Sequence, residues 1–360
     1  MLSLLAPRAA AGAPALTIAA ASWAGWCGGS SRLFSGSPAA AAAAAEPPPA
    51  AGGAAAPDGS GSGEDERAAT LPVEQLAKAL LAGNARGQLT TVKAGSPAHD
   101  ESKVSSSVVP YLCPKGEAPV VLLGEHEAEH LANLGHDAKA SLATGHISPT
   151  WFIQRLRGTG WLPRRVALLG LLEPLPDAEA QFALEQTRKA YAGAPALAAL
   201  LPREERLSAA GLKGFRLGSL SQCVYVDHAG RQHNVAPQDL DACYLDPLAL
   251  PQHDLLAELN QQVEWLPQLQ LFCAAYLGVH TSGVLLTEAD RMGFTLFGRP
   301  AVEAVESAEG RAQVDLAAAQ QQRWRQFRIG SARELRSKQA FLELLQQMKE
   351  EVKAATGAEL

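Results

Sequence analysis

The residues best suited to chemistry lie in a short polar segment between positions 125 and 133. His126 and His130 are four residues apart, so on a helix they would share one face, which is the geometry that a metal ion requires. The segment matches no established zinc motif, and a solvated acidic helix surface accounts for it better, so we predict no metal site. At the helix end, His130 and Asn133 could instead donate hydrogen bonds to a phosphate or a carboxylate, although a capped surface helix is the simpler interpretation.

Two further groups of residues could help to bind an anion. Ser105, Ser106 and Ser107 lie on a probable strand, where alternate hydroxyls face opposite sides, so at most two of them can reach one ligand. The arginines between positions 155 and 165 surround a glycine-containing loop and could hold an anion through bidentate contacts, unless the loop is merely solvated. The candidate ligand groove therefore comprises Ser107, Tyr111, His130, Asn133, Lys139 and Arg157.

Established catalytic motifs are absent from the sequence, and we assign no catalytic residue. It contains no GxGxxG, GxxxxGK[ST], HExxH or GxSxG, which argues against classical nucleotide-binding, zinc-protease and serine-hydrolase activities. The formal net charge of −6 and the lack of a basic stripe disfavour binding to nucleic acid or to an anionic membrane surface. Five widely spaced cysteines without a CxxC pair indicate a reducing compartment.

The first 70 residues resemble a targeting sequence followed by a linker. Residues 1–45 contain two arginines, several serines and long runs of alanine, and they contain no acidic residue. This composition is typical of an organelle transit peptide. Their apolar runs are broken before they reach the roughly 20 residues that span a bilayer, so we expect no integral membrane segment. Residues 46–70 form a Pro/Gly/Ala/Ser linker that we expect to be disordered.

The next part of the chain, residues 71–246, predicts an antiparallel barrel. A first helix is followed by several short strands, a helix over Ala178–Tyr191, and two strands at Phe215–Leu220 and Cys223–Val226 that read as a hairpin. No alternation of strand and helix is sustained, so a parallel sheet is not expected.

A second unit, residues 247–355, begins where two prolines in five residues oppose continuation of a helix or a central strand. We predict a mostly helical stretch over His253–Leu277 that is interrupted at Pro267. Strands joined by a turn at Asp290–Gly293 and a closing amphipathic helix complete a small α/β domain.

Several strings, in this order, resemble the pyridoxamine-phosphate-oxidase-like FMN-binding split barrel in its HugZ-type branch. In the barrel unit they are Leu89–Val92, Ser105–Tyr111, Pro119–Leu123, His130–Leu134 and Ala138–Leu142. In the second unit, Asp290–Phe294 and the strings between Arg328 and Leu345 resemble the domain of unknown function that follows this barrel. The resemblance covers residues 73–353 and implies an α+β fold, with an antiparallel split β-barrel followed by a small α/β domain. Because split barrels commonly pair, we expect a homodimer.

The resemblance also bears on the ligand. The family segment "HT-x-NL", which helps to hold the flavin phosphate, corresponds to His130–Leu134, with Leu131 where a hydroxyl is expected. The family segment "HMNxDH" corresponds to Glu258–Val263, which keeps Asn260 and lacks both histidines. These departures favour binding without turnover, and the implied cofactor is haem or FMN, or none.

Within the family, the chain is most similar to plant and algal plastid members. This similarity implies a location in the chloroplast stroma, with the mitochondrion as the alternative. It also implies a haem-linked role in regulating tetrapyrrole synthesis through a partner such as glutamyl-tRNA reductase or another plastid enzyme. An FMN-dependent oxidoreductase or HugZ-type haem oxygenase is the alternative, and a dimerisation scaffold without a ligand is the third interpretation.

Overall fold

The structure is a computed structural model, and it describes residues 70–94, 104–113, 115, 117–145, 152, 156, 159, 161–301 and 323–356. The predicted transit peptide at residues 1–45 and all but the last residue of the predicted linker at 46–70 lie outside this range. The described residues fall within one compact unit. In this part of the chain, no helix is long and apolar enough to cross a membrane.

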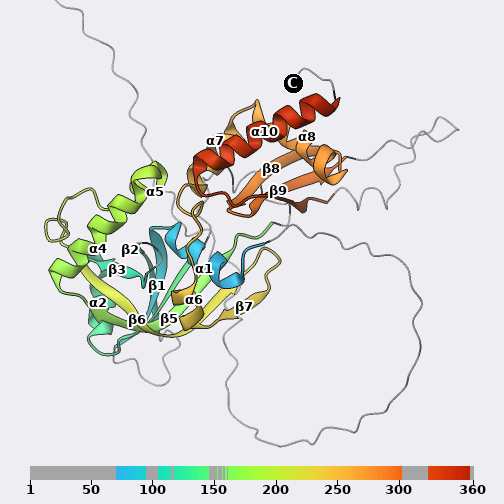
Figure 1. The fold of residues 1–360 in the computed structure, drawn as a ribbon. Helices are drawn as coiled ribbons and strands as arrows, with labels where there is room; N and C mark the ends of the chain where they lie inside the picture. Colours follow the sequence, from blue (N-terminus) through green and yellow to red (C-terminus); the bar gives the residue numbers. More distant parts are fainter. Residues whose placement is uncertain are drawn as a thin grey trace, which may run out of the picture. The chain divides into compact units, whose positions relative to one another are not determined.

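An antiparallel barrel forms the first half of the described chain (Figure 1). Its strands are β1 (Arg86–Val92), β2 (Val104–Leu112), β3 (Val120–Leu123), β4 (Lys139–Gly145), β5 (Arg165–Pro174) and β6 (Lys213–Val226). Hydrogen-bonded neighbours follow the order β3–β2–β1–β4–β5–β6, and pairing of β6 with β3 closes the barrel. The short strand β7 (Gln232–Val235) pairs with β6. The predicted α+β split-barrel fold is therefore confirmed.

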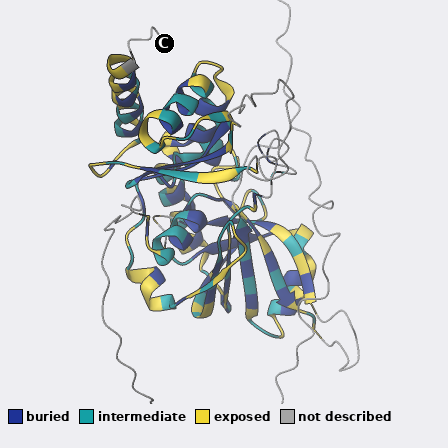
Figure 2. Ribbon diagram, turned by 90° about the vertical axis from the view of Figure 1, so that its right-hand side faces the viewer, coloured by how far each residue is buried: buried dark blue, intermediate teal, exposed yellow. Residues whose placement is uncertain are grey.

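The barrel core comes from the alternation of side chains along the strands, which Figure 2 shows as alternating buried and exposed bands. On β5, for example, Val166 and Leu168 are buried inside, whereas Leu169 points outward and is 42% exposed. Helix α1 (Val73–Ala82) adds Leu80 and Leu81 to the same core.

The predicted hairpin at the end of the barrel is wrong, because β6 continues without a break from Lys213 to Val226. The irregularity that resembled a turn is a β-bulge. The register of β5 against β6 shifts between Leu169 and Leu171, and Ser219 has a positive φ of 43°. A bulge bends a strand without ending it, so it resembles a turn in the sequence.

Short helices surround the barrel. They are η3 (Glu125–Glu127), α2 (Ala128–Leu134), α4 (Asp177–Ala190), η4 (Tyr191–Gly193), α5 (Pro195–Ala198) and α6 (Pro237–Ala242). The helix predicted over Ala178–Tyr191 is confirmed by α4 to within one residue at each end. Its buried residues Ala180 and Leu184 pack with Leu112 and Leu122 of β2 and β3 in a second apolar cluster.

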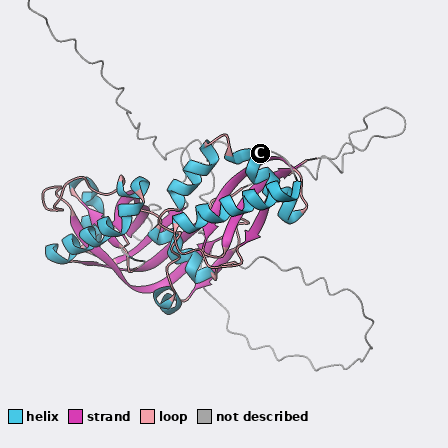
Figure 3. Ribbon diagram, turned by 45° about the horizontal axis from the view of Figure 1, so that its top comes forward, coloured by secondary structure: helices cyan, strands magenta, loops and turns pink. Residues whose placement is uncertain are grey.

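The second half contains an antiparallel sheet in the order β10–β9–β8, with helices on one face (Figures 1 and 3). The strands are β8 (Thr281–Asp290), β9 (Gly293–Pro300) and β10 (Arg325–Gly330). The helices are α7 (Gln252–Gln261), α8 (Trp265–Leu277) and α10 (Lys338–Thr356). Their apolar residues, such as Leu255, Phe272 and Phe341, form one core with Leu286 and Phe294 of the sheet.

The predicted helix break at Pro267 is displaced in the structure. Helix α7 ends at Gln261, and Pro267 lies in the first turn of α8. A proline is tolerated there because the first backbone N–H groups of a helix have no partner within the helix. The turn predicted at Asp290–Gly293 is confirmed, since it joins β8 to β9.

Asn260 of α7 fastens this helix to the edge of the sheet. Its Oδ1 accepts a hydrogen bond from the backbone N–H of Leu286 at 2.8 Å, and its Nδ2 donates to the Leu286 carbonyl at 2.8 Å. The side chain therefore satisfies both backbone groups at the buried outer edge of β8, which β9 cannot reach.

Candidate functional site

Ser107 of β2 and the candidate residues His130 and Asn133 of α2 meet at one end of the barrel. In the register of β1 and β2, Thr91 lies opposite Ser105, and Leu89 opposite Ser107. Ser105 and Ser107 project to the same side as the buried Leu89 and Thr91, whereas Ser106 projects outward and contacts Thr90 at 3.0 Å. As the alternation predicts, two of the three hydroxyls share a side.

His130 of α2 lies between two hydroxyl groups and is 3% exposed. Its Nδ1 is 2.8 Å from Thr91 Oγ1, and its Nε2 is 2.8 Å from Ser107 Oγ. Burial lowers the pKa of His130 below its ordinary value of 6.5, and the neighbouring carboxylates of Glu129 and Glu127 offset only part of this effect. The imidazole is therefore neutral at physiological pH.

Asn133 is also fully engaged. Its Nδ2 donates to Thr91 Oγ1 at 3.0 Å and to Ser105 Oγ at 3.2 Å, and its Oδ1 accepts from the backbone N–H of Ala94 at 3.0 Å. Both amide hydrogens and the amide oxygen thus have protein partners. The next polar group outward is Glu129, which accepts a hydrogen bond from Ser105 at 2.5 Å.

These contacts limit the hydrogen bonds that His130 can make. Among the described residues, the Thr91 hydroxyl bonds only to Asn133 Nδ2, which is a donor, and to His130 Nδ1. A neutral imidazole carries one ring hydrogen, so His130 either accepts from Thr91 at Nδ1 and donates from Nε2 to Ser107, or donates from Nδ1 to Thr91 and accepts from Ser107 at Nε2. In either arrangement the single ring hydrogen is donated within the protein, to Ser107 or to Thr91, and is not available to a ligand.

The family resemblance implies a flavin phosphate at this helix end, and the residues present do not fit one. Phosphate oxygens accept hydrogen bonds, but the donors of His130 and Asn133 are already used by Ser107, Thr91 and Ser105. Leu131, which replaces the expected hydroxyl, packs against the barrel core. Among the described residues of this cluster, at most the hydrogen of the half-buried Ser107 hydroxyl is left for a ligand.

The remaining candidate residues do not join this cluster. Tyr111 is fully buried, its hydroxyl donates to the Leu81 carbonyl at 2.7 Å, and burial raises its pKa well above the ordinary value. Lys139 is exposed at the start of β4. Arg157 lies outside the described residues. Ligand binding by these three side chains stays a prediction.

The two histidines that suggested a metal do not share a helix face. His126 is exposed in η3, and α2 begins only at Ala128, so the segment is not one continuous helix. His130 is buried with both ring nitrogens hydrogen-bonded. Within the described part of the chain, no group of three potential metal-ligating side chains occurs.

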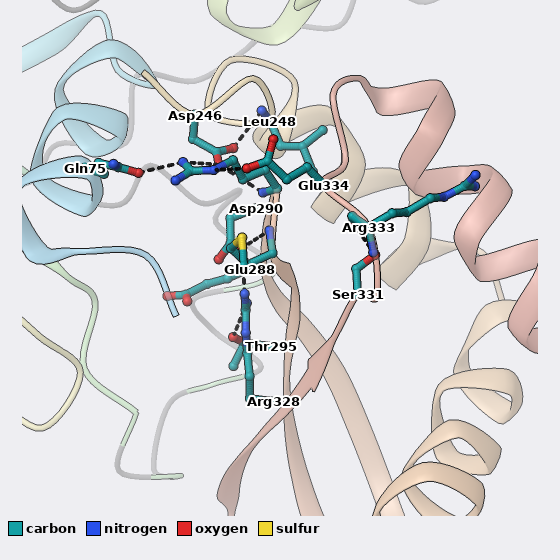
Figure 4. Close-up of polar contacts among 12 residues, drawn as sticks. Gln75, Asp246, Leu248, Glu288, Asp290, Thr295, Arg328, Ser331, Arg333 and Glu334 are labelled. Atoms are coloured by element: carbon teal, nitrogen blue, oxygen red, sulfur yellow. Dashed lines mark hydrogen bonds and ion pairs between the residues drawn. The ribbon is translucent and has the colours of Figure 1, made fainter. Parts of the chain in front are cut away.

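A second polar cluster, which the sequence did not reveal, lies where the barrel half meets the small sheet. The Glu288 carboxylate of β8 contacts both Arg164 and His228, and it is 6% exposed. Burial and the neighbouring Arg164 lower the pKa of His228 to about 3. Arg328 donates to Asp290 at 2.6 Å on the same sheet (Figure 4). Arg164 and Glu288 are 124 residues apart in sequence, so no local pattern could reveal the pair.

No protein-family model and no curated protein matches the chain. Among solved structures, it is similar to a haem-binding protein of Mycobacterium smegmatis, with 22% identity, 78% of this chain and 99% of that chain covered, and a TM-score of 0.47. Campylobacter jejuni ChuZ has 12% identity, coverage of 48% and 63%, and a TM-score of 0.34. The Vibrio cholerae haem-storage protein HutZ has 17% identity, coverage of 42% and 87%, and a TM-score of 0.26. Haem binding and storage in these names are properties of those proteins.

Proposed function

We propose that this chain is a haem-linked binding protein of the plastid stroma that regulates a partner enzyme of tetrapyrrole synthesis, such as glutamyl-tRNA reductase. The observation that carries the proposal is the closed hydrogen-bond network of Thr91, Ser107, His130 and Asn133. A split barrel whose flavin-phosphate donors are turned inward has lost the means to hold FMN, which favours the regulatory members over the flavin enzymes.

In this proposal, His130 and His228 do not coordinate the haem iron. Both ring nitrogens of His130 are hydrogen-bonded, and those of His228 contact the Leu162 carbonyl and Glu288. An iron ligand needs a free imidazole nitrogen. We therefore propose recognition of the porphyrin ring and its propionates rather than a protein–iron bond from these residues.

The regulatory part of the proposal is tested with purified glutamyl-tRNA reductase and the full-length chain. Complex formation, measured by surface plasmon resonance, should change several-fold when haem is added. The exposed substitution His126→Ala serves as a control and should leave the response unchanged. Failure of the two proteins to bind, with and without haem, would exclude this enzyme as the partner.

We also propose that the chain forms a homodimer through the outer face of the barrel. Two adjacent cross-strand rows on this face carry no charge: Val108, Gln88, Ala143, Ala167, and Ser106, Thr90, Ser141, Leu169. Val108 and Leu169 are 47% and 42% exposed. An uncharged face that crosses four strands suits self-association. Leu169→Glu should convert a dimer to a monomer in light-scattering measurements, and a monomeric wild-type protein would contradict the proposal.

A further inference from the structure

We propose that a surface pocket beside the β8–β9 turn binds the carboxylate-bearing edge of a tetrapyrrole, an inference that rests on the proposed function. The pocket has a volume of about 340 Å³ and is lined by Tyr244, Pro247, Arg291, Glu334 and Arg336. These residues come from the segment between α6 and α7, the β8–β9 turn and the loop between β10 and α10. None of them belongs to the cluster of Thr91, Ser107, His130 and Asn133.

The backbone of Arg291 connects the three walls of the pocket through hydrogen bonds. Its N–H donates to the buried Asp246 carboxylate at 2.9 Å, and its carbonyl accepts from the Leu335 N–H at 2.8 Å. Because Leu335 is fully buried, its neighbours Glu334 and Arg336 lie at the surface on either side of it. The pocket is therefore held open before any ligand arrives, which lowers the entropy lost on binding.

The Arg291 side chain is held in a fixed position within the pocket. Nη1 donates to Gln75 at 2.6 Å, Nε is 3.5 Å from the Glu334 carboxylate, and the guanidinium carbon lies 6.0 Å from the centre of the Tyr244 ring. Among the described residues, its Nη2 has no hydrogen-bond partner. Because Nη1 also lies 3.7 Å from the Asp246 carboxylate, the N–H groups left for a ligand carboxylate are those of Nη2.

Tyr244 and Arg336 supply the other two parts of the site. Tyr244 is 63% exposed, so its ring is accessible to a ligand beside the Arg291 guanidinium. Arg336 is exposed and has no ion pair within the described part of the chain. Two guanidinium groups beside an aromatic face suit a planar ring that carries two carboxylates. A tetrapyrrole with its two propionates has this chemistry.

Glu334 should weaken the binding of this ligand, so replacing it predicts an increase in affinity. Its carboxylate is paired with Arg291 and is 54% exposed, so a propionate must compete with it. Removing its charge should make Arg291 more available. Glu334→Gln should therefore tighten binding of the carboxylated ring.

The test uses the full-length chain, titrated with iron-free protoporphyrin IX and with its dimethyl ester, which lacks the carboxylates. Porphyrin fluorescence reports binding of either compound. We expect the ester to bind at least about tenfold more weakly, Arg336→Ala and Tyr244→Ala to weaken protoporphyrin binding by about tenfold each, and Glu334→Gln to strengthen it several-fold. Arg333→Ala, which removes an adjacent exposed arginine outside the pocket, should have no such effect.

The outcomes separate this inference from the proposed function. If the wild-type chain binds protoporphyrin and haem but Arg336→Ala and Tyr244→Ala bind them equally well, the pocket is not the site, while haem binding stands. If the ester binds as tightly as the acid, carboxylate recognition is wrong. If the wild-type chain binds neither porphyrin, both proposals are contradicted. Circular dichroism of each variant confirms that these exposed substitutions leave the fold intact.

Discussion

Ser107 Oγ lies 2.8 Å from His130 Nε2, and this contact closes a network of hydrogen bonds that runs from β1 through α2 to β2. The network explains how helix α2 is attached at the barrel end. It also explains why the helix end has few donors left for a phosphate. The same polar atoms that would bind a ligand in a flavin site hold this barrel together.

Replacing His130 with alanine should destabilise the protein by about 2–4 kcal/mol. The change leaves a cavity and removes the partner of the Thr91 and Ser107 hydroxyls. The midpoint of urea unfolding measures the effect. The exposed residue four positions earlier offers a matched control, because His126→Ala should shift the midpoint very little. Equal effects of the two substitutions would contradict the described environment of His130.

Stability should fall as the pH drops from 7 towards 5. The pKa of His130 in the folded protein lies below its ordinary value of 6.5, so the unfolded state takes up the proton first as the pH falls. The stability that the neutral His130 imidazole contributes is present above pH 6.5 and is lost on acidification. The free energy of unfolding should change by at most about 1.4 kcal/mol per pH unit through this group. His228 and His253, whose pKa values burial also lowers, act in the same direction.

The contribution of His130 to this pH dependence is measured by comparing urea unfolding of the wild type and His130→Gln between pH 7 and 5. The variant should lose less stability on acidification than the wild type does. Parallel pH profiles would show that His130 does not change its protonation between the folded and unfolded states.

Glu288→Gln should destabilise the protein by about 3–5 kcal/mol. Arg164 would then be left without its carboxylate partner in a largely buried position. Thermal unfolding measures the loss, and Glu343→Gln, on the exposed surface of α10, provides the comparison. If the two variants melt at the same temperature, the contact between the barrel half and the small sheet contributes little to stability.

Asn260→Leu should destabilise the small sheet by about 1–3 kcal/mol, although leucine is a good helix former. The loss arises because the N–H and carbonyl of Leu286 become buried without partners. Hydrogen exchange at the Leu286 amide should become faster in the variant. Gln261→Leu, at the exposed next position, is the control and should leave that amide protected.

Much of the fold can be predicted from local patterns, whereas the site depends on distant contacts. Alternation along β1 and β2 predicts that Ser105 and Ser107 share a side, and helical spacing predicts α4. The hairpin prediction fails at Ser219 because a bulge and a turn have the same local signature.

The pairing of Arg164 with Glu288 and of Gln75 with Arg291 joins residues 124 and 216 positions apart. The spacing rules for helices and strands do not predict contacts between residues so distant in sequence. The inward orientation of His130 is equally hidden, because it depends on where α2 lies against the barrel. The string Asp290–Gly293 did mark a turn, but only the structure shows its ion pairs.

The central claim is that the chain binds haem and not FMN, and parallel titrations of the full-length protein test it most directly. We predict a saturable shift of the Soret band with haem and no quenching of flavin fluorescence with FMN at the same protein concentrations. Saturable quenching of FMN fluorescence, with no Soret shift, would contradict the claim and would favour a flavin enzyme.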